Sequence, residues 1–252
     1  MLPAAPFALP VQVAVGRLPA VEQTELSTRV SQARVRVAAA VLAAGRAPES
    51  VSILPVTKGF PPEMLGDVLA AGFTAVGENR VGEAQAKRDE LPDLPLSYHM
   101  IGHLQRNKAA AAVRVFDRID SVDSLRLARR LDALAGPAGR TDMPVLVQIN
   151  ASGETSKGGL TIESAVASVD SICTLNNLRV RGLMTMAPID ADARTLHEVF
   201  SRVRRCLEEC RKHIAGFEGT ELSMGMSNDF EIAIAEGATQ VRLGTVLLGE
   251  RR

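Results

Sequence analysis

The stretch VSILPVTKGFPPEMLGDVLAAGFTAVGEN, residues 51–79, contains a strand, a helix and a second strand in immediate succession. An apolar, β-branched run at 51–58 is followed by a helical pattern at 62–71 and by a second short run at 75–79. Proline stands at the start of the helical pattern, and Gly72 stands just past its end, which are usual boundary signals. Because consecutive parallel strands need a crossover helix between them, the stretch predicts parallel α/β architecture.

The same alternation continues along the rest of the chain. The strand candidates are 51–58, 75–79, 97–102, 118–122, 145–150, 180–186, 221–226 and 240–246. The helical segments between them are 62–71, 81–90, 106–115, 124–135, 161–175, 193–214 and 229–236, and a further helical stretch at 21–44 precedes the first strand. Eight strands alternating with helices in 252 residues favour a single (β/α)8 TIM barrel, with a doubly wound sheet as the alternative.

Composition narrows the class of protein. Lysine plus arginine and aspartate plus glutamate number 29 each, and this zero net charge argues against a general nucleic-acid binder. The apolar segment 1–20 has no basic start and no long apolar run, so we expect a loosely ordered extension and neither a signal peptide nor a membrane span. The barrel domain is then 21–252. We interpret the three cysteines as reduced packing residues, which favours a cytoplasmic location.

Lys58 is the first candidate for chemistry. It closes the first strand, and the active face of a TIM barrel lies at the carboxyl ends of its strands. A lysine at that place is either an amine kept out of water, competent to form an imine, or a rim charge paired with an acid.

The far side of the expected barrel supplies a second indication. The segments SMGMSND, residues 223–229, and RLGT, residues 242–245, follow the seventh and eighth strands, where this fold usually holds phosphate. Ser227 or Asn228 could instead be a plain helix cap. Opposite an imine-forming lysine, the two segments favour a site for a phosphorylated aldehyde.

Other residues reach the same mouth. Asn79, the region 99–102 and the methionines Met184 and Met186 stand at predicted strand ends, so we expect them at this end of the barrel. Methionines at such positions either fill the core or form a wall of a cofactor site. His99 and His103 have a spacing that metal ligands use, but no third ligand is evident, so we expect no metal.

Eight short motifs occur in one order along nearly the whole chain. They are VTK (56–58), GEN (77–79), HMIGHLQRNK (99–108), QIN (148–150), SKGG (156–159), RGLM (181–184), LSMGMS (222–227) and VRLGT (241–245). Together they resemble the pyridoxal phosphate homeostasis protein family, the one-domain relatives of alanine racemase. The resemblance implies the barrel of the alanine racemase N-terminal domain, that is, PLP fold type III.

The resemblance also implies a cofactor and the residues around it. Pyridoxal 5'-phosphate (PLP) would be held as a Schiff base, an internal aldimine, on Lys58. Arg242 would approach the pyridine nitrogen, which weakens the ring as an electron sink and suits a carrier of the cofactor rather than an enzyme. The residues expected around the cofactor are Lys58, Asn79, Met184, Ser223, Met226, Ser227, Arg242, Gly244 and Thr245.

One position departs from the family pattern. Many members have a second lysine two residues after the first, where this chain has Phe60, and Lys157 is the remaining nearby candidate for its role.

The alternatives are enzymes. An amino-acid racemase needs an acid/base on each face of the cofactor, and the single tyrosine, Tyr98, lies at the wrong end of its strand for that role. A cofactor-free aldolase fits the fold but not the motifs. The sequence therefore predicts a monomeric carrier that buffers PLP, with PLP-dependent apo-enzymes as candidate acceptors and no nucleic-acid or membrane partner.

Overall fold

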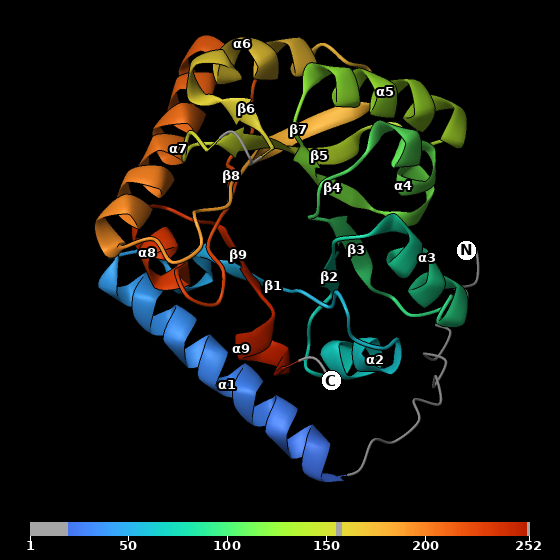
Figure 1. Cartoon of the computed structure of the whole chain (residues 1–252), viewed down its shortest axis with the longest axis vertical. Helices are drawn as coiled ribbons and strands as arrows, with labels where there is room; N and C mark the ends of the chain where they lie inside the picture. The colour runs from blue at the N-terminus through green and yellow to red at the C-terminus, as the bar shows by residue number, and fades with distance from the viewer. Residues whose placement is uncertain (1–19, 155–157, 251–252) are drawn as a thin grey trace, which may run out of the picture.

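The structure, a computed structural model, describes residues 20–154 and 158–250. Within these ranges eight parallel strands form a ring that helices surround (Figure 1). The ring strands are β1 (Ser52–Pro55), β2 (Ala75–Glu78), β3 (Ser97–Met100), β4 (Arg118–Val122), β5 (Met143–Asn150), β7 (Leu178–Met184), β8 (Glu221–Ser223) and β9 (Gln240–Leu243). The remaining strand, β6 (Leu160–Thr161), pairs with β5 outside this path, and its residues were predicted to be helix or loop.

The strand order identifies the fold as a nearly closed barrel. It runs β1-β9-β8-β7-β5-β4-β3-β2, so the first strand pairs with the last, from Ser52 opposite Gln240 to Pro55 opposite Leu243. The ring is completed between β1 and β2 by an isolated parallel bridge of Val56 and Gly77. The TIM barrel prediction is confirmed, and the doubly wound alternative is wrong because β1 pairs with β9 on one side and is bridged to β2 on the other, whereas an open sheet of this order would leave β1 at an edge.

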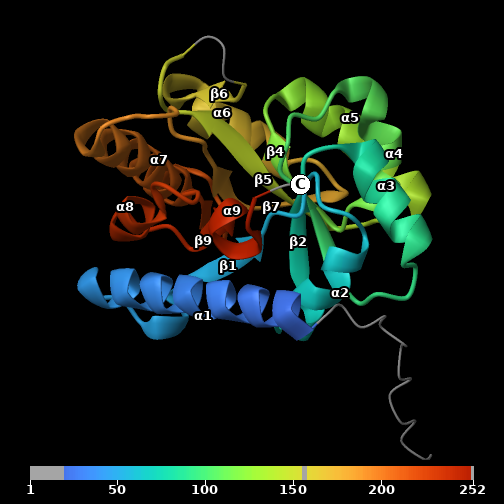
Figure 2. The same ribbon diagram turned by 60° about the horizontal axis from the view of Figure 1, so that its bottom comes forward.

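The helices cover the outside of the ring. They are α1 (Ala20–Ala43), α2 (Glu63–Ala70), α3 (Val81–Glu90), α4 (Ala109–Val115), α5 (Leu125–Ala135), α6 (Ile162–Cys173), α7 (Ala193–His213), α8 (Phe230–Ala235) and α9 (Thr245–Leu248). The additional helix α1 runs along the outside of the barrel, where it contacts α8 and α9 (Figures 1 and 2). No helix in the described part of the chain is both long enough and apolar enough to cross a bilayer.

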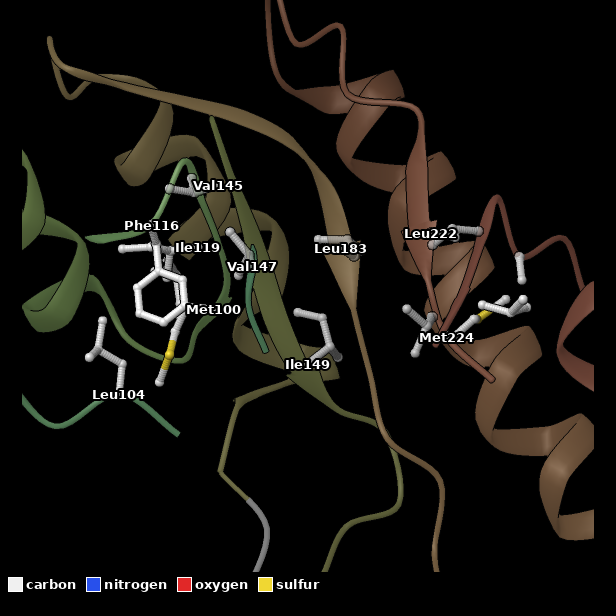
Figure 3. Packing of buried hydrophobic residues seen from close by; sticks show 14 of the residues in the cluster. Met100, Leu104, Phe116, Ile119, Val145, Val147, Ile149, Leu183, Leu222 and Met224 are labelled. Atoms are coloured by element: carbon white, nitrogen blue, oxygen red, sulfur yellow. The ribbon is translucent and has the colours of Figure 1, made fainter. Parts of the chain in front are cut away.

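The main core lies between the strands and the helices. Side chains of this layer such as Met100, Phe116 and Leu183 are fully buried, and Figure 3 shows them with their neighbours on adjacent strands. A second, separate cluster of Leu54, Val56 and Ile101 comes from alternate positions of β1 and from the end of β3. Because successive strand residues point to opposite faces, this small cluster occupies the inside of the ring.

Several predicted boundaries differ from the structure. The strands predicted at 51–58 and 221–226 end earlier, at Pro55 and Ser223. The eighth strand was expected at 240–246, but it ends at Leu243 and α9 begins at Thr245, since the N–H groups of Leu247 and Leu248 bond to the Gly244 carbonyl. Burial of both leucines stabilises this extra turn. The expected extension at 1–20 lies outside the described residues, apart from the first residue of α1.

Candidate functional site

Lys58 lies directly beyond β1 and points into a cavity at the carboxyl ends of the strands. Leu54 and Val56 belong to the inner cluster, and Lys58 follows in the turn after β1, on the side of the cavity. Its side chain is partly buried and lines a cavity of about 410 Å³ together with Val56 and Asn79. The side chain of Lys58 therefore reaches the cavity at the carboxyl ends of the strands.

Another wall of the cavity is built by the turn after β8. Gly225 has φ +95°, and a Cβ there would lie 2.7 Å from the Cβ of Ala233 and 2.9 Å from the Cα of Phe230, so this position requires glycine. The Met226 N–H donates to Asp229 Oδ1 at 2.5 Å, which closes the turn before α8. Met226, Ser227, Asn228 and Asp229 all line the cavity.

Asp229 is a buried carboxyl group at this wall. Burial raises the pKa of Asp229, although the Met226 N–H and the charge of Arg242 oppose the rise. A bound anion can lie near Asp229, because a carboxyl group with a raised pKa takes up a proton more readily and then carries no negative charge to repel the anion.

Arg242 forms the floor of the cavity and is 4% exposed. Its guanidinium donates to the Ser223 carbonyl at 2.7 Å, to Ser223 Oγ at 2.9 Å and to the Thr185 carbonyl at 2.8 Å. Burial lowers the pKa of Arg242, whereas the charges of Asp120 and Asp229 raise it. Three hydrogen bonds hold the planar group in one orientation, with a positive charge directed at the cavity.

A charged layer lies among the ring-facing side chains below Arg242. Arg118 donates to Asp120 Oδ1 at 2.5 Å and contacts Glu221 at 2.6 Å, while His99 Nδ1 lies 3.7 Å from Asp120 Oδ2. Asp120 is fully buried; burial alone would raise its pKa, but Arg118 and His99 hold the pKa of Asp120 below its usual value. The interior of this barrel is therefore polar beneath the cavity.

The expected site residues fall into two groups. Seven line the cavity: Lys58, Asn79, Met226, Ser227, Arg242, Gly244 and Thr245. Met184 and Ser223 are fully buried neighbours in the β7–β8 register and do not line it; Met186, two residues further along, does. Ser223 reaches the site through its hydrogen bond to Arg242.

Residues that the sequence interpretation missed come from the connection between β7 and α7. Pro188, Ile189, Asp190 and Ala191 line the cavity, as does Leu196 in the first turn of α7. Asp190 has φ +59°, and the side chain of Ile189 is 85% exposed. The available signal was positional, because every loop after a strand reaches the active face of a TIM barrel.

The other residues considered from the sequence lie away from the cavity centre. Phe60 is partly buried and packs against the main core, while Lys157 lies outside the described residues. Tyr98 is 1% exposed under the guanidinium of Arg88, on the helix side of β3. His103 lines the rim of the cavity with its Nδ1 3.1 Å from Asp123 Oδ2, and the described ranges contain no group of three potential metal ligands.

The donor set fits a small phosphorylated aldehyde. Lys58, Ser227, Gly244 and Thr245 line the same cavity, with the buried guanidinium of Arg242 at its floor. The sequence placed the 242–245 segment on the far side of the barrel, but that expectation is wrong, because β9 pairs directly with β1 and a Cβ at Gly244 would lie 3.8 Å from the Cβ of Val56. The amine suits a carbonyl carbon, and the small hydroxyl and glycine residues suit an anionic tail.

Comparisons with known proteins agree with this geometry. The family model described as alanine racemase, N-terminal domain, matches residues 38–252. The pyridoxal phosphate homeostasis protein of Pseudomonas aeruginosa is 40% identical over 226 residues, which are 90% of this chain and 96% of that protein.

Solved structures extend the comparison. PipY of Synechococcus elongatus, solved with PLP bound, is 37% identical, with a TM-score of 0.79 over 89% of this chain and all of that one. Alanine racemase of Clostridium difficile, at 15% identity and a TM-score of 0.71 over 90% of this chain and 56% of that one, shows the shared fold alone. With this fold, this cavity and these relatives, the chain belongs to the pyridoxal phosphate homeostasis protein family.

Proposed function

We propose that this protein binds pyridoxal 5'-phosphate covalently through Lys58 and takes part in maintaining the cellular supply of the cofactor. The observation that carries the proposal is that Lys58 lines one cavity together with Ser227, Gly244 and Thr245, with Arg242 at its floor. A homologue at 37% identity was solved with PLP bound, which supports the same ligand here.

Each of the nine residues expected around the cofactor has a role in this proposal. Lys58 Nζ adds to the aldehyde carbon and one water molecule leaves, so that a carbon–nitrogen double bond forms reversibly. Ser227, Gly244 and Thr245 hold the phosphate with hydroxyl and main-chain N–H donors, and Met226 and Asn79 enclose the ring. Ser223 orients Arg242, and Met184 supports the floor beside Ser223.

The role of Arg242 favours a carrier over an enzyme. When bound, the cofactor can act as an electron sink, and it does so best with a protonated ring nitrogen. Arg242 has three fixed hydrogen bonds and keeps its positive charge beside the ring, which opposes that protonation. The protein then retains and releases the cofactor without efficient turnover.

A racemase is the second candidate, and the position of Tyr98 argues against it. Racemisation needs a second acid/base in the cavity, but the single tyrosine of this chain is buried on the helix side of β3. We further infer that PLP-dependent apo-enzymes receive the cofactor, that the carrier works as a monomer and that it acts in the cytoplasm, where its free thiols stay reduced.

One experiment tests ligand and attachment site together. The purified protein is incubated with PLP, reduced with borohydride, digested and analysed by mass spectrometry. We expect the added mass on Lys58, and we expect Lys58→Ala to lack the visible absorption of the adduct. Labelling of another lysine at wild-type yield, or efficient racemase turnover by protein free of contaminating racemase, would contradict the proposal.

A further inference from the structure

Lys87, on α3, is a buried lysine that the proposed function does not use. It is 2% exposed, and its Nζ donates to the Thr57 carbonyl at 2.7 Å, to Glu78 Oε1 at 2.5 Å and to Glu83 Oε1 at 2.9 Å. An ammonium group has three protons, so all of its donors are used. We call these four residues, Lys87, Thr57, Glu78 and Glu83, the Lys87 cluster.

The Lys87 cluster holds the main chain on both sides of Lys58. On one side, Lys87 binds the Thr57 carbonyl, and Thr57 Oγ1 donates to Glu78 Oε1 at 2.6 Å. On the other side, the Gly59 N–H donates to Glu83 Oε1 at 2.5 Å, and Gly59 has the left-handed φ of +74°. The residue between these two anchored positions is the amine-bearing Lys58.

Contacts separate the cluster from the cavity. Thr57 bonds through its hydroxyl to Glu78 and through its carbonyl to Lys87 of α3, whereas Lys58, in the turn after β1, lines the cavity. Burial agrees with this division, because Thr57 and Glu78 are fully buried whereas Lys58 lines the cavity. The cluster therefore acts on the main chain of Lys58 and not on its amine.

The seam between β1 and β2 is where such support is needed. The two strands are joined by one isolated bridge, Val56 with Gly77, and by the hydrogen bond from the Thr57 N–H to the Gly77 carbonyl at 3.1 Å. By contrast, the pairing of β5 with β7 extends over six residue pairs. Lys58 and Asn79 stand at the ends of the weakly paired strands, so their relative position depends on side-chain contacts.

We propose that Lys87 is a positioning residue for Lys58, acting through Glu78 and Glu83 to fix the strand end that presents the amine to the cavity. This inference rests on the proposed covalent binding of PLP. Misplacement of a reacting group by about 1 Å can lower reactivity by about 100-fold. Loss of the cluster should therefore reduce covalent attachment although Lys58 itself is unchanged.

Lys87→Met is the first test, with Lys212→Met as the matched control, because Lys212 is an exposed lysine in the last turn of α7. Each protein is incubated with the same concentration of PLP and reduced, and the labelled fraction of Lys58 is measured by mass spectrometry. Circular dichroism and denaturant unfolding report whether the variant is folded. We expect folded Lys87→Met to be labelled at least about tenfold less than wild type, and Lys212→Met to match wild type.

Glu83 provides the second test, in case Lys87→Met does not fold. Its side chain is 27% exposed, so its replacement disturbs the core less. Glu83→Ala removes the acceptor of the Gly59 N–H, whereas Glu83→Gln keeps an amide oxygen there. We expect the labelled fraction to fall in Glu83→Ala and to recover, at least partly, in Glu83→Gln.

The outcomes distinguish the two proposals. If wild type and Lys212→Met are not labelled on Lys58, the proposed function itself fails. If they are labelled, wild-type labelling of folded Lys87→Met or of Glu83→Ala would overturn the positioning role. Equal losses in both Glu83 variants would also overturn it, since the route through the Gly59 N–H would then be irrelevant.

Discussion

Replacing Gly102 by alanine would drive a methyl group into the main chain of Asn79. A Cβ at Gly102 would lie 2.4 Å from the carbonyl oxygen of Asn79 and 2.7 Å from its Cα, where ordinary van der Waals contact begins at 3.4 Å. These atoms are main-chain atoms and cannot rotate away. The end of β2 or of β3 must therefore move by about 1 Å, which changes the distance between Asn79 and the cavity floor.

The size of the effect follows from that displacement. Overpacking of this kind typically lowers the free energy of unfolding by about 1–3 kcal/mol. A shift of about 1 Å in a group that positions a ligand can weaken its function by about 100-fold. For Gly102→Ala we expect the dissociation constant for PLP to rise between about tenfold and 100-fold, which corresponds to about 1.4–2.8 kcal/mol.

The assay is a PLP titration followed by visible absorption, with denaturant unfolding of the same samples. Gly82→Ala is the matched control, because Gly82 lies in the first turn of α3 and a Cβ there would meet nothing within 4 Å. We expect this control to bind PLP as wild type does and to be equally or more stable, since alanine favours helix. If folded Gly102→Ala bound PLP with wild-type affinity, the inferred role of Asn79 at the rim would be refuted.

Three further predictions concern stability and ionisation. Burial raises the pKa of Tyr98 from 10.0 to about 12, so ultraviolet titration of this single tyrosine should show ionisation near pH 12. The free energy of unfolding should fall as the pH rises above 10, because the unfolded chain loses the phenol proton first. Ionisation of the tyrosine near pH 10 in the folded protein would contradict this prediction. Phe116→Ala should lower the free energy of unfolding by about 3–5 kcal/mol, because the ring is fully buried, while Leu42→Ala, at a side chain 78% exposed, should change it by less than about 0.5 kcal/mol. Ser124→Ala removes the side-chain acceptor of the Leu127 N–H at the start of α5 and should lower the free energy of unfolding by about 0.5–2 kcal/mol in the same assay. An unchanged denaturation midpoint would show that Ser124 does not stabilise this helix end.

The sequence predicted the fold in detail because its signals are local. Apolar runs of strand length alternate with helical periodicity, and the predicted ring strands agree with the structure within a few residues. The error at 240–246 arose where the run continues into Val246 and Leu247, since an apolar run alone does not distinguish a strand from a short buried helix. Only the backbone turn at Gly244 separates the two elements.

The site could be predicted in part for a related reason. The placement of Lys58 and of residues 226–227 and 244–245 at one mouth follows from the rule that strand ends converge there. The choice between Met184 and Met186 does not follow from it, because both share the inner face of β7 and only the stagger of the strands decides which one reaches the cavity. Residues 188–191 line the cavity because of the path that their loop takes, and a loop has no hydrophobic periodicity from which that path could be predicted.

By itself, then, the sequence determined the barrel and brought Lys58 and the segments 226–227 and 244–245 to one end of it, since each depends on a pattern within a few neighbouring residues. The tertiary structure alone decided which groups the buried Lys87 binds. On α3 this lysine follows the buried Val81 and Ala84 at intervals of three residues, but a lysine at such a position does not reveal what it pairs with. Two of its three acceptors, Thr57 and Glu78, are 30 and 9 residues away in the chain. Contacts of that kind exist only after the barrel brings β1, β2 and α3 together, because a buried charge is stable only where its partners already converge.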